Sequence, residues 1–210
     1  MKRIDPRSGA RLGAAPGTKA SEEMLQQATA RLSFRRARDI LPGKIETPRL
    51  ILRAPIRGDV PALTALADNK NIAEKLSRLP SPYTRADAIA FVEIFSQRAD
   101  ERPYAITTQA GDLLGIVGFS YAMGQHPELG YWLGEPHWGK GFMSEAAKAL
   151  LEAAFATGLY PAIRARALQS NLASINVLEK AGFKNIGPAS DPMGAEKNRP
   201  VFEFRLEQPR

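Results

Sequence analysis

Three apolar stretches in the middle of the chain constrain its fold most, because only a few residues separate them. They span residues 104–108, 113–121 and 128–134, with turn residues at 111–112 and 125–127 between them. Strands joined by turns this short pair in the antiparallel sense. The sequence therefore predicts an antiparallel meander at the centre of the fold.

Helical and strand patterns alternate on both sides of this meander. Asp59 is expected to cap a helix over 59–68, and Thr84 with Asp87 forms a capping-box pattern for a helix reaching about residue 98. The remaining predicted elements are a strand within 46–56, a short helix near 70–77, a helix ending before Gly158, a strand at 162–168, a helix over 172–181, and strands at 183–187 and 201–206. The polar segment 188–200 predicts a surface loop that can meet a substrate.

Charge divides the chain into two parts. Residues 1–44 hold ten Lys or Arg against four Asp or Glu, a balance of +6, and the rest holds nineteen against eighteen, a balance of +1. Residues 1–20 lack apolar periodicity, which predicts a disordered tail, and a helix is predicted over 21–40 with Ser21 as its N-cap. We therefore expect a basic, partly disordered extension at 1–44 and one folded domain at 45–210.

Composition excludes several kinds of site. The chain has no cysteine, which rules out a disulfide scaffold, a thiolate metal site and a cysteine nucleophile. Its two histidines, His126 and His137, argue against a multi-histidine zinc site, so no metal is predicted. No apolar run is long enough to span a membrane, and no apolar segment follows the early basic residues, so a cytoplasmic location is expected.

A glycine-rich loop between a strand and a helix carries the strongest chemical signal. The segment Trp138-Gly139-Lys140-Gly141-Phe142-Met143 leads directly into a long helical pattern. The first N–H groups of a helix have no intrahelical partner and lie at the positive end of its dipole, which favours phosphate binding. The segment lacks the Gly-Lys-Ser/Thr of a Walker loop, and Ser144 breaks the GxGxxG pattern. Taken alone, a tight structural turn explains it about as well.

Several spaced motifs together resemble the GNAT superfamily of acyl-CoA-dependent N-acyltransferases, and within it the ribosomal-protein N-terminal alanine acetyltransferase branch. The resembling segments are TPRLILR at 47–53, ELGYWLGEPHWGKGFMSEA at 128–146 and SNLASINVLEKAGF at 170–183, within a match covering about 45–206. The resemblance implies an α+β fold with a mixed, mostly antiparallel sheet of about six to seven strands. Helices would flank this sheet, and a splayed strand pair would hold acyl-CoA.

The same resemblance implies roles for particular residues. The family's pyrophosphate loop falls on Trp138, Gly139, Lys140, Gly141, Phe142 and Met143, with Trp138 in place of a polar residue. The pantetheine arm of acetyl-CoA would pair with the backbone of Tyr131, Trp132 and Leu133, and Asn171 would contact the acyl-CoA arm. Ser174 would protonate the departing thiolate, because the tyrosine that many relatives carry four positions later is Leu178 here. Sheet packing for the aromatic rings and helix capping for Asn171 explain those residues equally well.

The implied reaction needs a base for the amine and an acid for the thiolate. Glu128, at the start of the splayed strand, is the first candidate base, and Glu135 is the second. Glu145 falls inside the helical pattern, where a structural role is expected. Direct attack on acetyl-CoA requires no covalent enzyme intermediate, which agrees with the missing cysteine.

Three hypotheses of different class remain open. The first is an acetyl-CoA-dependent N-acetyltransferase acting on a protein N-terminus or a small-molecule amine. The second is a non-catalytic acyl-CoA-binding module on the same fold. The third is an RNA- or ribosome-binding protein that uses the basic residues 1–44, since the nearly neutral domain gives little support to nucleic-acid binding by the core. A monomer or a homodimer is compatible with each.

Overall fold

The computed structural model describes residues 18–190 and 199–209. The strands are β1 (Lys44–Glu46), β2 (Leu50–Arg53), β3 (Glu101–Thr108), β4 (Leu113–Ser120), β5 (Glu128–Leu133), β6 (Ala162–Leu168), β7 (Lys184–Ser190) and β8 (Pro200–Glu207). The α-helices are α1 (Thr18–Ile40), α2 (Val60–Ala67), α3 (Lys70–Ala73), α4 (Arg85–Glu93), α5 (Phe142–Ala156) and α6 (Leu172–Lys180), and the 3-10 turns are η1 (Arg57–Asp59), η2 (Phe95–Gln97) and η3 (Glu135–His137).

The predicted meander is confirmed as β3, β4 and β5 in the middle of one open sheet. The strand order is β1-β2-β3-β4-β5-β6-β8-β7, and the pairing is antiparallel except between β5 and β6. The sheet has eight strands rather than six to seven, because the run predicted as one strand near residue 50 forms a hairpin. Pro48 interrupts the run, and the Thr47 N–H donates to the Leu50 carbonyl at 2.9 Å. The predicted α+β class, mixed and mostly antiparallel, is confirmed.

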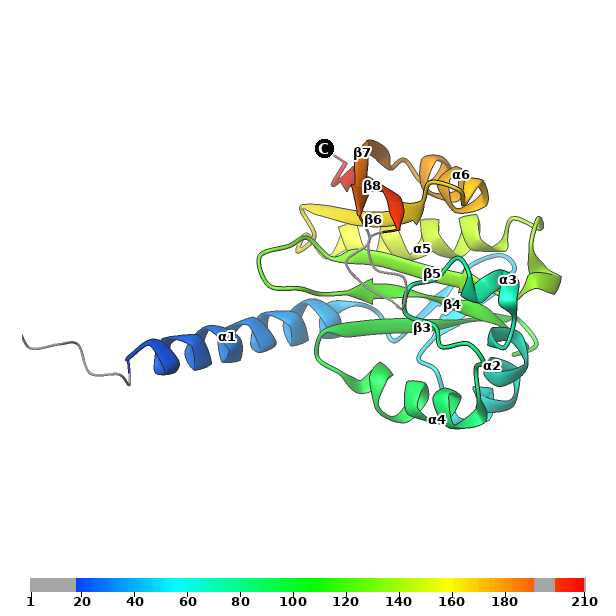
Figure 1. Ribbon diagram of the computed structural model, residues 1–210, viewed down its shortest axis with the longest axis horizontal. Helices are drawn as coiled ribbons and strands as arrows, with labels where there is room; N and C mark the ends of the chain where they lie inside the picture. The colour runs from blue at the N-terminus through cyan, green and yellow to red at the C-terminus, as the bar shows by residue number, and fades with distance from the viewer. Residues whose placement is uncertain (1–17, 191–198, 210) are drawn as a thin grey trace, which may run out of the picture.

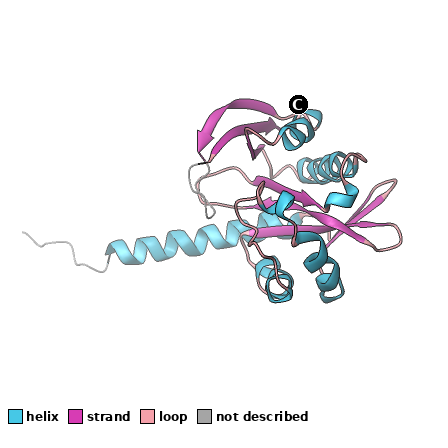
Figure 2. Ribbon diagram, turned by 45° about the vertical axis from the view of Figure 1, so that its right-hand side comes forward, coloured by secondary structure: helices cyan, strands magenta, loops and turns pink. Residues whose placement is uncertain are grey.

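Helices cover the sheet on two faces, as Figure 1 and Figure 2 show. On one face α5 buries Ala147, Leu150 and Ala154 completely against a large apolar cluster, and small side chains there let the helix lie close to the strands. On the other face α2 and α4 form a smaller cluster with the central strands, which includes Ala105 and Ile116. Both faces of β4 are therefore buried, so this strand anchors the two layers.

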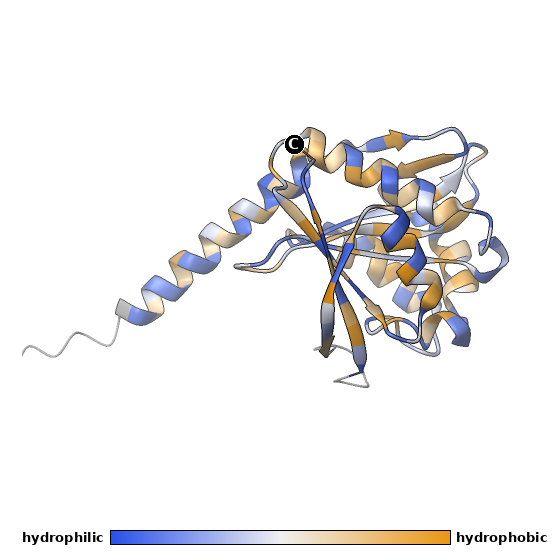
Figure 3. Ribbon diagram, turned by 90° about the horizontal axis from the view of Figure 1, so that it is seen from above, coloured by the Kyte–Doolittle hydropathy of each residue, from blue (hydrophilic) through white to orange (hydrophobic). Residues whose placement is uncertain are grey.

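Helix α1 extends away from the sheet and alternates hydrophilic and hydrophobic residues along most of its length (Figure 3). Its last turns nevertheless contact the folded body. Phe34 stacks on Tyr121 with ring centroids 6.1 Å apart, and the Tyr160 hydroxyl donates to the Ala37 carbonyl at 2.6 Å. Leu41, just after the helix, is 3% exposed. The helix begins at Thr18, earlier than predicted, and most of the predicted tail lies outside the described residues.

The sequence predicts two helix caps, at Thr84 and at Asp59, and the structure gives their side chains different roles. Thr84 and Asp87 form the predicted capping box, in which Asp87 Oδ2 accepts from the Thr84 N–H at 2.8 Å. Asp59 is the N-cap residue of α2, as predicted, but its side chain makes no capping hydrogen bond to that helix. Its carboxylate instead accepts two hydrogen bonds of 2.7 Å from the Arg53 guanidinium, because a buried carboxylate is stabilised best by a paired cation. The predicted loop at 188–200 is strand up to Ser190, and 191–198 lies outside the described residues.

Candidate active site

Strands β5 and β6 separate after two paired positions. Only Glu128 with Arg164 and Leu129 with Ala165 are in register, so residues 130–133 have no partner on the β6 side. The Pro127 carbonyl accepts from the Arg164 N–H at 2.9 Å, which turns its backbone towards β6. The backbone N–H and C=O groups of successive residues point to alternate sides of a strand. The N–H and C=O groups of Tyr131 and Leu133 therefore also point into the gap, whereas those of Trp132 point to β4. The predicted splay is present, with Tyr131 and Leu133 supplying its free backbone groups.

A cavity of about 840 Å³ opens at this gap and continues over the sheet face that α2 and α4 cover. It brings together residues from the meander, the glycine loop and α6. The predicted site residues that line it are Glu128, Tyr131, Trp132, Leu133, Trp138, Gly139, Gly141, Phe142, Met143, Asn171 and Ser174. Lys140 and the second candidate base, Glu135, do not line it.

The glycine loop presents unpaired backbone donors to one end of this cavity. Gly139 and Gly141 have φ values of 71° and 77°, a left-handed conformation that other residues adopt at a cost. No hydrogen bond within the described residues uses the N–H of Gly139, Lys140 or Gly141. Gly141 is also the N-cap of α5, whose first N–H groups lie beside them. The arrangement is a cradle for an anion.

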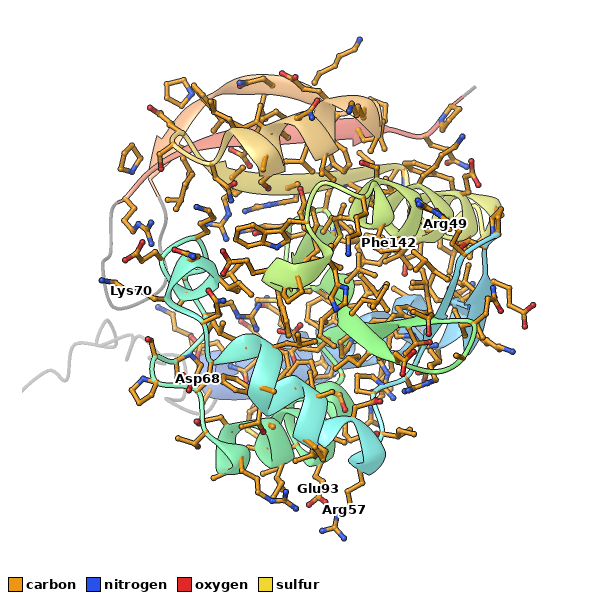
Figure 4. The ribbon with its side chains drawn as sticks, turned by 90° about the vertical axis from the view of Figure 1, so that its right-hand side faces the viewer. Arg49, Arg57, Asp68, Lys70, Glu93 and Phe142 are labelled. Carbon is orange, nitrogen blue, oxygen red and sulfur yellow. The ribbon has the colours of Figure 1, made fainter. Side chains whose placement is uncertain are left out.

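Arg49 and Glu145 fix this cradle to the β1–β2 hairpin, a role that the sequence prediction missed. Arg49 Nε donates to Glu145 Oε2 at 2.6 Å, and its Nη1 donates to the Lys140 carbonyl at 3.0 Å. The guanidinium also lies over the Phe142 ring, 4.7 Å from its centroid (Figure 4). Thr47 donates its hydroxyl to Glu145 Oε1 at 2.6 Å. Burial alone would raise the pKa of Glu145, but the hydrogen bonds from Thr47 and Arg49 lower it. Glu145 therefore has the structural role expected of it.

Two loop side chains are committed to protein carbonyls. Lys140 Nζ donates to the Pro136 carbonyl at 2.8 Å. Trp138 Nε1 donates to the Leu133 carbonyl at 2.6 Å, which satisfies one of the backbone groups left free by the splay. Trp138 thus closes the loop onto the end of β5.

The Tyr131 hydroxyl lies 2.9 Å from Ser174 Oγ and also donates to the Ser174 carbonyl at 3.1 Å. Burial raises the pKa of Tyr131 to about 12, so the phenol is neutral and protonated at pH 7. Asn171 caps α6 by accepting from the Ser174 N–H at 3.2 Å. The Tyr131 hydroxyl on β5 thus contacts Ser174 on α6, a relation that residue spacing does not reveal.

The candidate bases have contrasting environments. Arg166 donates twice to Glu128 Oε1, at 3.0 and 2.9 Å, and Arg164 pairs with Oε2 at 2.9 Å.

Hydrogen bonds from the Asn69 and Asn71 amides lower the pKa of Glu135, which does not line the cavity and is therefore a weak second candidate. Burial and the nearby Lys140 lower the pKa of His137, so its imidazole adds no positive charge to the cavity wall at pH 7.

Within residues 18–190 and 199–209, no cluster of His, Asp and Glu has the arrangement of a metal site. None of the helices formed by those residues is long and apolar enough to cross a membrane.

The comparisons with known proteins agree with this geometry. Residues 49–184 match the acetyltransferase (GNAT) domain family. A Bacillus licheniformis relative, named uncharacterized N-acetyltransferase p20, is 28% identical over 150 residues, which cover 69% of this chain and 84% of the relative.

Two solved structures share the fold. The RimL ribosomal L7/L12 alpha-N-protein acetyltransferase in complex with coenzyme A has a TM-score of 0.68 at 23% identity, covering 78% of this chain and 97% of that one. The Vibrio cholerae spermidine N-acetyltransferase in complex with CoA and spermine has a TM-score of 0.66 at 20% identity, covering 77% and 97%. Since the family match spans well over half of the sequence, this chain belongs to the GNAT acetyltransferase family.

Proposed function

We propose that this enzyme transfers the acetyl group of acetyl-CoA to a primary amine, either a protein N-terminus or a small-molecule amine, by direct attack. The observation that carries the proposal is the continuity of one cavity from the cradle at residues 139–144 through the β5–β6 splay. A phosphate-bearing thioester with a long flexible arm matches that shape. The solved relatives in complex with CoA support the same cofactor.

The residues present fit acetyl-CoA in chemistry as well as in shape. The N–H groups of Gly139, Lys140 and Gly141 would hold the pyrophosphate, together with those of Phe142 and Met143 at the start of α5. The pantetheine amides would pair with the backbone groups of Tyr131 and with the N–H of Leu133, since the Leu133 carbonyl already accepts from Trp138. The same strand would polarise the thioester carbonyl through a backbone N–H, which favours the developing oxyanion.

Ser174 and Tyr131 form the proposed route of a proton to the leaving sulfur. A thiolate leaves more readily when a hydroxyl donates a proton or a hydrogen bond to it. Ser174 Oγ lies at the cavity wall, and the Tyr131 hydroxyl 2.9 Å away orients it. Glu128 stays a predicted base, although both of its oxygens already accept from arginines.

The proposal is tested by calorimetry with acetyl-CoA and by mass spectrometry of a panel of amines incubated with the enzyme. We expect saturable binding and a product heavier by one acetyl group. Absence of acetyl-CoA binding would refute the proposed function. Binding without turnover of any amine would instead favour the acyl-CoA-binding module.

A further inference from the structure

A row of polar residues crosses three strands on the face that α2 and α4 cover. Glu101 on β3 pairs in register with Ser120 on β4, which pairs with Glu128 on β5. Cross-strand partners point to the same face of a sheet, and strands lie about 4.8 Å apart. The two carboxylates therefore flank Ser120 on one face, with their α-carbons about 10 Å apart. All three residues line the cavity.

The neighbouring row of residues also lines the cavity. It consists of Pro103, Gly118 and Gly130, which are also partners in register. A Cβ added to Gly130 would meet nothing within 4 Å, and this glycine is the first residue beyond the last β5–β6 pair. The cavity thus has open space at Gly130, at the start of the splay where acetyl-CoA would present its thioester. Its wall continues through Gly118 and Pro103 to Glu101.

The carboxylates of Glu128 and Glu101 differ in how many of their oxygens already have a partner. Glu128 Oε1 accepts two hydrogen bonds from Arg166, and Glu128 Oε2 forms an ion pair with Arg164. Glu101 uses Oε1 to pair with Arg78, whereas its Oε2 has no hydrogen-bond partner among the described residues. Oε2 is not among the fully buried unpaired atoms, so it contacts open space. Glu101 therefore has an accepting atom free in the cavity.

The surroundings of Glu101 also favour proton uptake. The residue is 7% exposed, and burial raises the pKa of its carboxyl even though Arg78 opposes that effect. The charged groups around it are Arg78 after α3, Arg98 and Asp100 between η2 and β3, and Glu128 two strands away. A carboxylate with a raised pKa is a better base than an ordinary glutamate.

We propose that Glu101 accepts the proton that the ammonium group of the acceptor loses before it attacks acetyl-CoA. The inference rests on the proposed acetyl transfer and assigns its base. The free amine forms a bond to the carbonyl carbon, the C–S bond breaks, and sulfur keeps its electron pair. Of the two protons that the ammonium loses, one passes through Glu101 to solvent and the other ends on the CoA sulfur.

The test compares kcat/KM of the wild type and of Glu101→Gln between pH 6.5 and 9, with free-N-terminal alanyl and seryl tetrapeptides and spermidine as acceptors. We expect a loss of about 100-fold for Glu101→Gln at pH 6.5, since a positioned base contributes about 10²–10⁴-fold. The loss shrinks at least about tenfold by pH 9, because a peptide α-amine of pKa about 7.7–8.0 is then already neutral. The acetyl-CoA affinity of the variant should equal that of the wild type.

Three further variants separate a base from a structural residue. Glu101→Asp should recover part of the activity and keep the wild-type pH profile, whereas Glu93→Gln, a surface carboxylate on α4, should change nothing. Two outcomes would overturn the inference while leaving acetyl transfer intact. In the first, Glu101→Gln loses the same factor in kcat/KM at every pH. In the second, Glu128→Gln loses activity and Glu101→Gln does not. A wild type that acetylates none of the amines would refute the proposed function and this inference with it.

Discussion

The two halves of the cavity are built from different kinds of chemical group. The half assigned to acetyl-CoA presents backbone N–H and C=O groups of one continuous segment, 130–144, in which Gly139 and Gly141 have positive φ. The acceptor half presents side chains such as Arg78, Glu101 and Arg166 from separate elements. Backbone groups are common to all residues, so we expect the first half to tolerate changes of side chain except at Gly139 and Gly141, whereas the second depends on which side chains are present.

Among the variants that test this contrast, Gly141→Glu is expected to have the largest effect, which is a loss of acetyl-CoA affinity. A side chain at φ 77° strains the turn, and a carboxylate there repels phosphate. Calorimetry should show that the affinity for acetyl-CoA falls by about 100-fold or more. Backbone strain at this position by itself costs about 1–2 kcal/mol. Gly124→Glu is the matched control, because Gly124 has a φ of 71° but does not line the cavity. Equal loss of affinity in the control would show that strain alone is responsible.

Tyr131→Phe is expected to lower kcat by about tenfold while acetyl-CoA affinity stays unchanged. The change removes the hydroxyl that lies 2.9 Å from Ser174 Oγ and preserves the ring. Steady-state kinetics measure it, with Tyr121→Phe as the control, since that hydroxyl contacts Tyr160 away from the cavity. An unchanged kcat would mean that Ser174 needs no partner.

Arg49→Ala tests whether the hairpin fixes the cradle. Losing the guanidinium leaves Glu145 and the Lys140 carbonyl without their main partner. We expect the KM for acetyl-CoA to rise about five- to tenfold, the effect of about 1 kcal/mol. Arg57→Ala removes a comparable ion pair, with Glu93, at the opposite end of the molecule (Figure 4). That exposed pair should contribute little, so a similar KM for both variants would argue against the clamp.

The same clamp predicts a small pH effect on stability. The folded-state pKa of Glu145 lies below its ordinary value of 4.5, so its contribution is present above that value and is lost as pH falls through the folded pKa. Thermal melting should therefore show a shallower decline between about pH 5 and 3 for Glu145→Gln than for the wild type. Parallel curves would contradict a stabilising role for the ionised carboxylate.

Lys140→Ala is expected to have the smallest effect. Its ammonium donates to the Pro136 carbonyl, and the side chain is exposed outside the cavity. Acetyl-CoA affinity should change by no more than about twofold, the scale of an exposed charge contact. A tenfold loss would show that side-chain charge, rather than backbone, holds the phosphates.

The segment that forms the proposed cofactor half was predictable as a strand, a glycine turn and a helix start, because these signals are local in sequence. A strand, two glycines and a helix start follow one another within residues 128–143, and this order needs no tertiary contact to be recognised. The finer contacts were not predictable. Trp132 was expected to pair through its backbone, but the register set by Pro127 and Arg164 turns that backbone to β4. Arg49 was part of a recognised motif, yet its contact with Glu145 joins residues 96 positions apart.

The sequence by itself determined the meander, the glycine turn and the family, since turn lengths, glycine positions and apolar periodicity act over a few residues. Only the tertiary structure decided which carboxylate keeps an oxygen without a hydrogen-bond partner. Glu128 and Glu101 are both glutamates at the start of a strand, and nothing local distinguishes them. The fold brings two arginines to Glu128, whereas one oxygen of Glu101 has no hydrogen-bond partner among residues 18–190 and 199–209. Charge pairing and burial act through space, so their outcome depends on packing that no short stretch of sequence encodes.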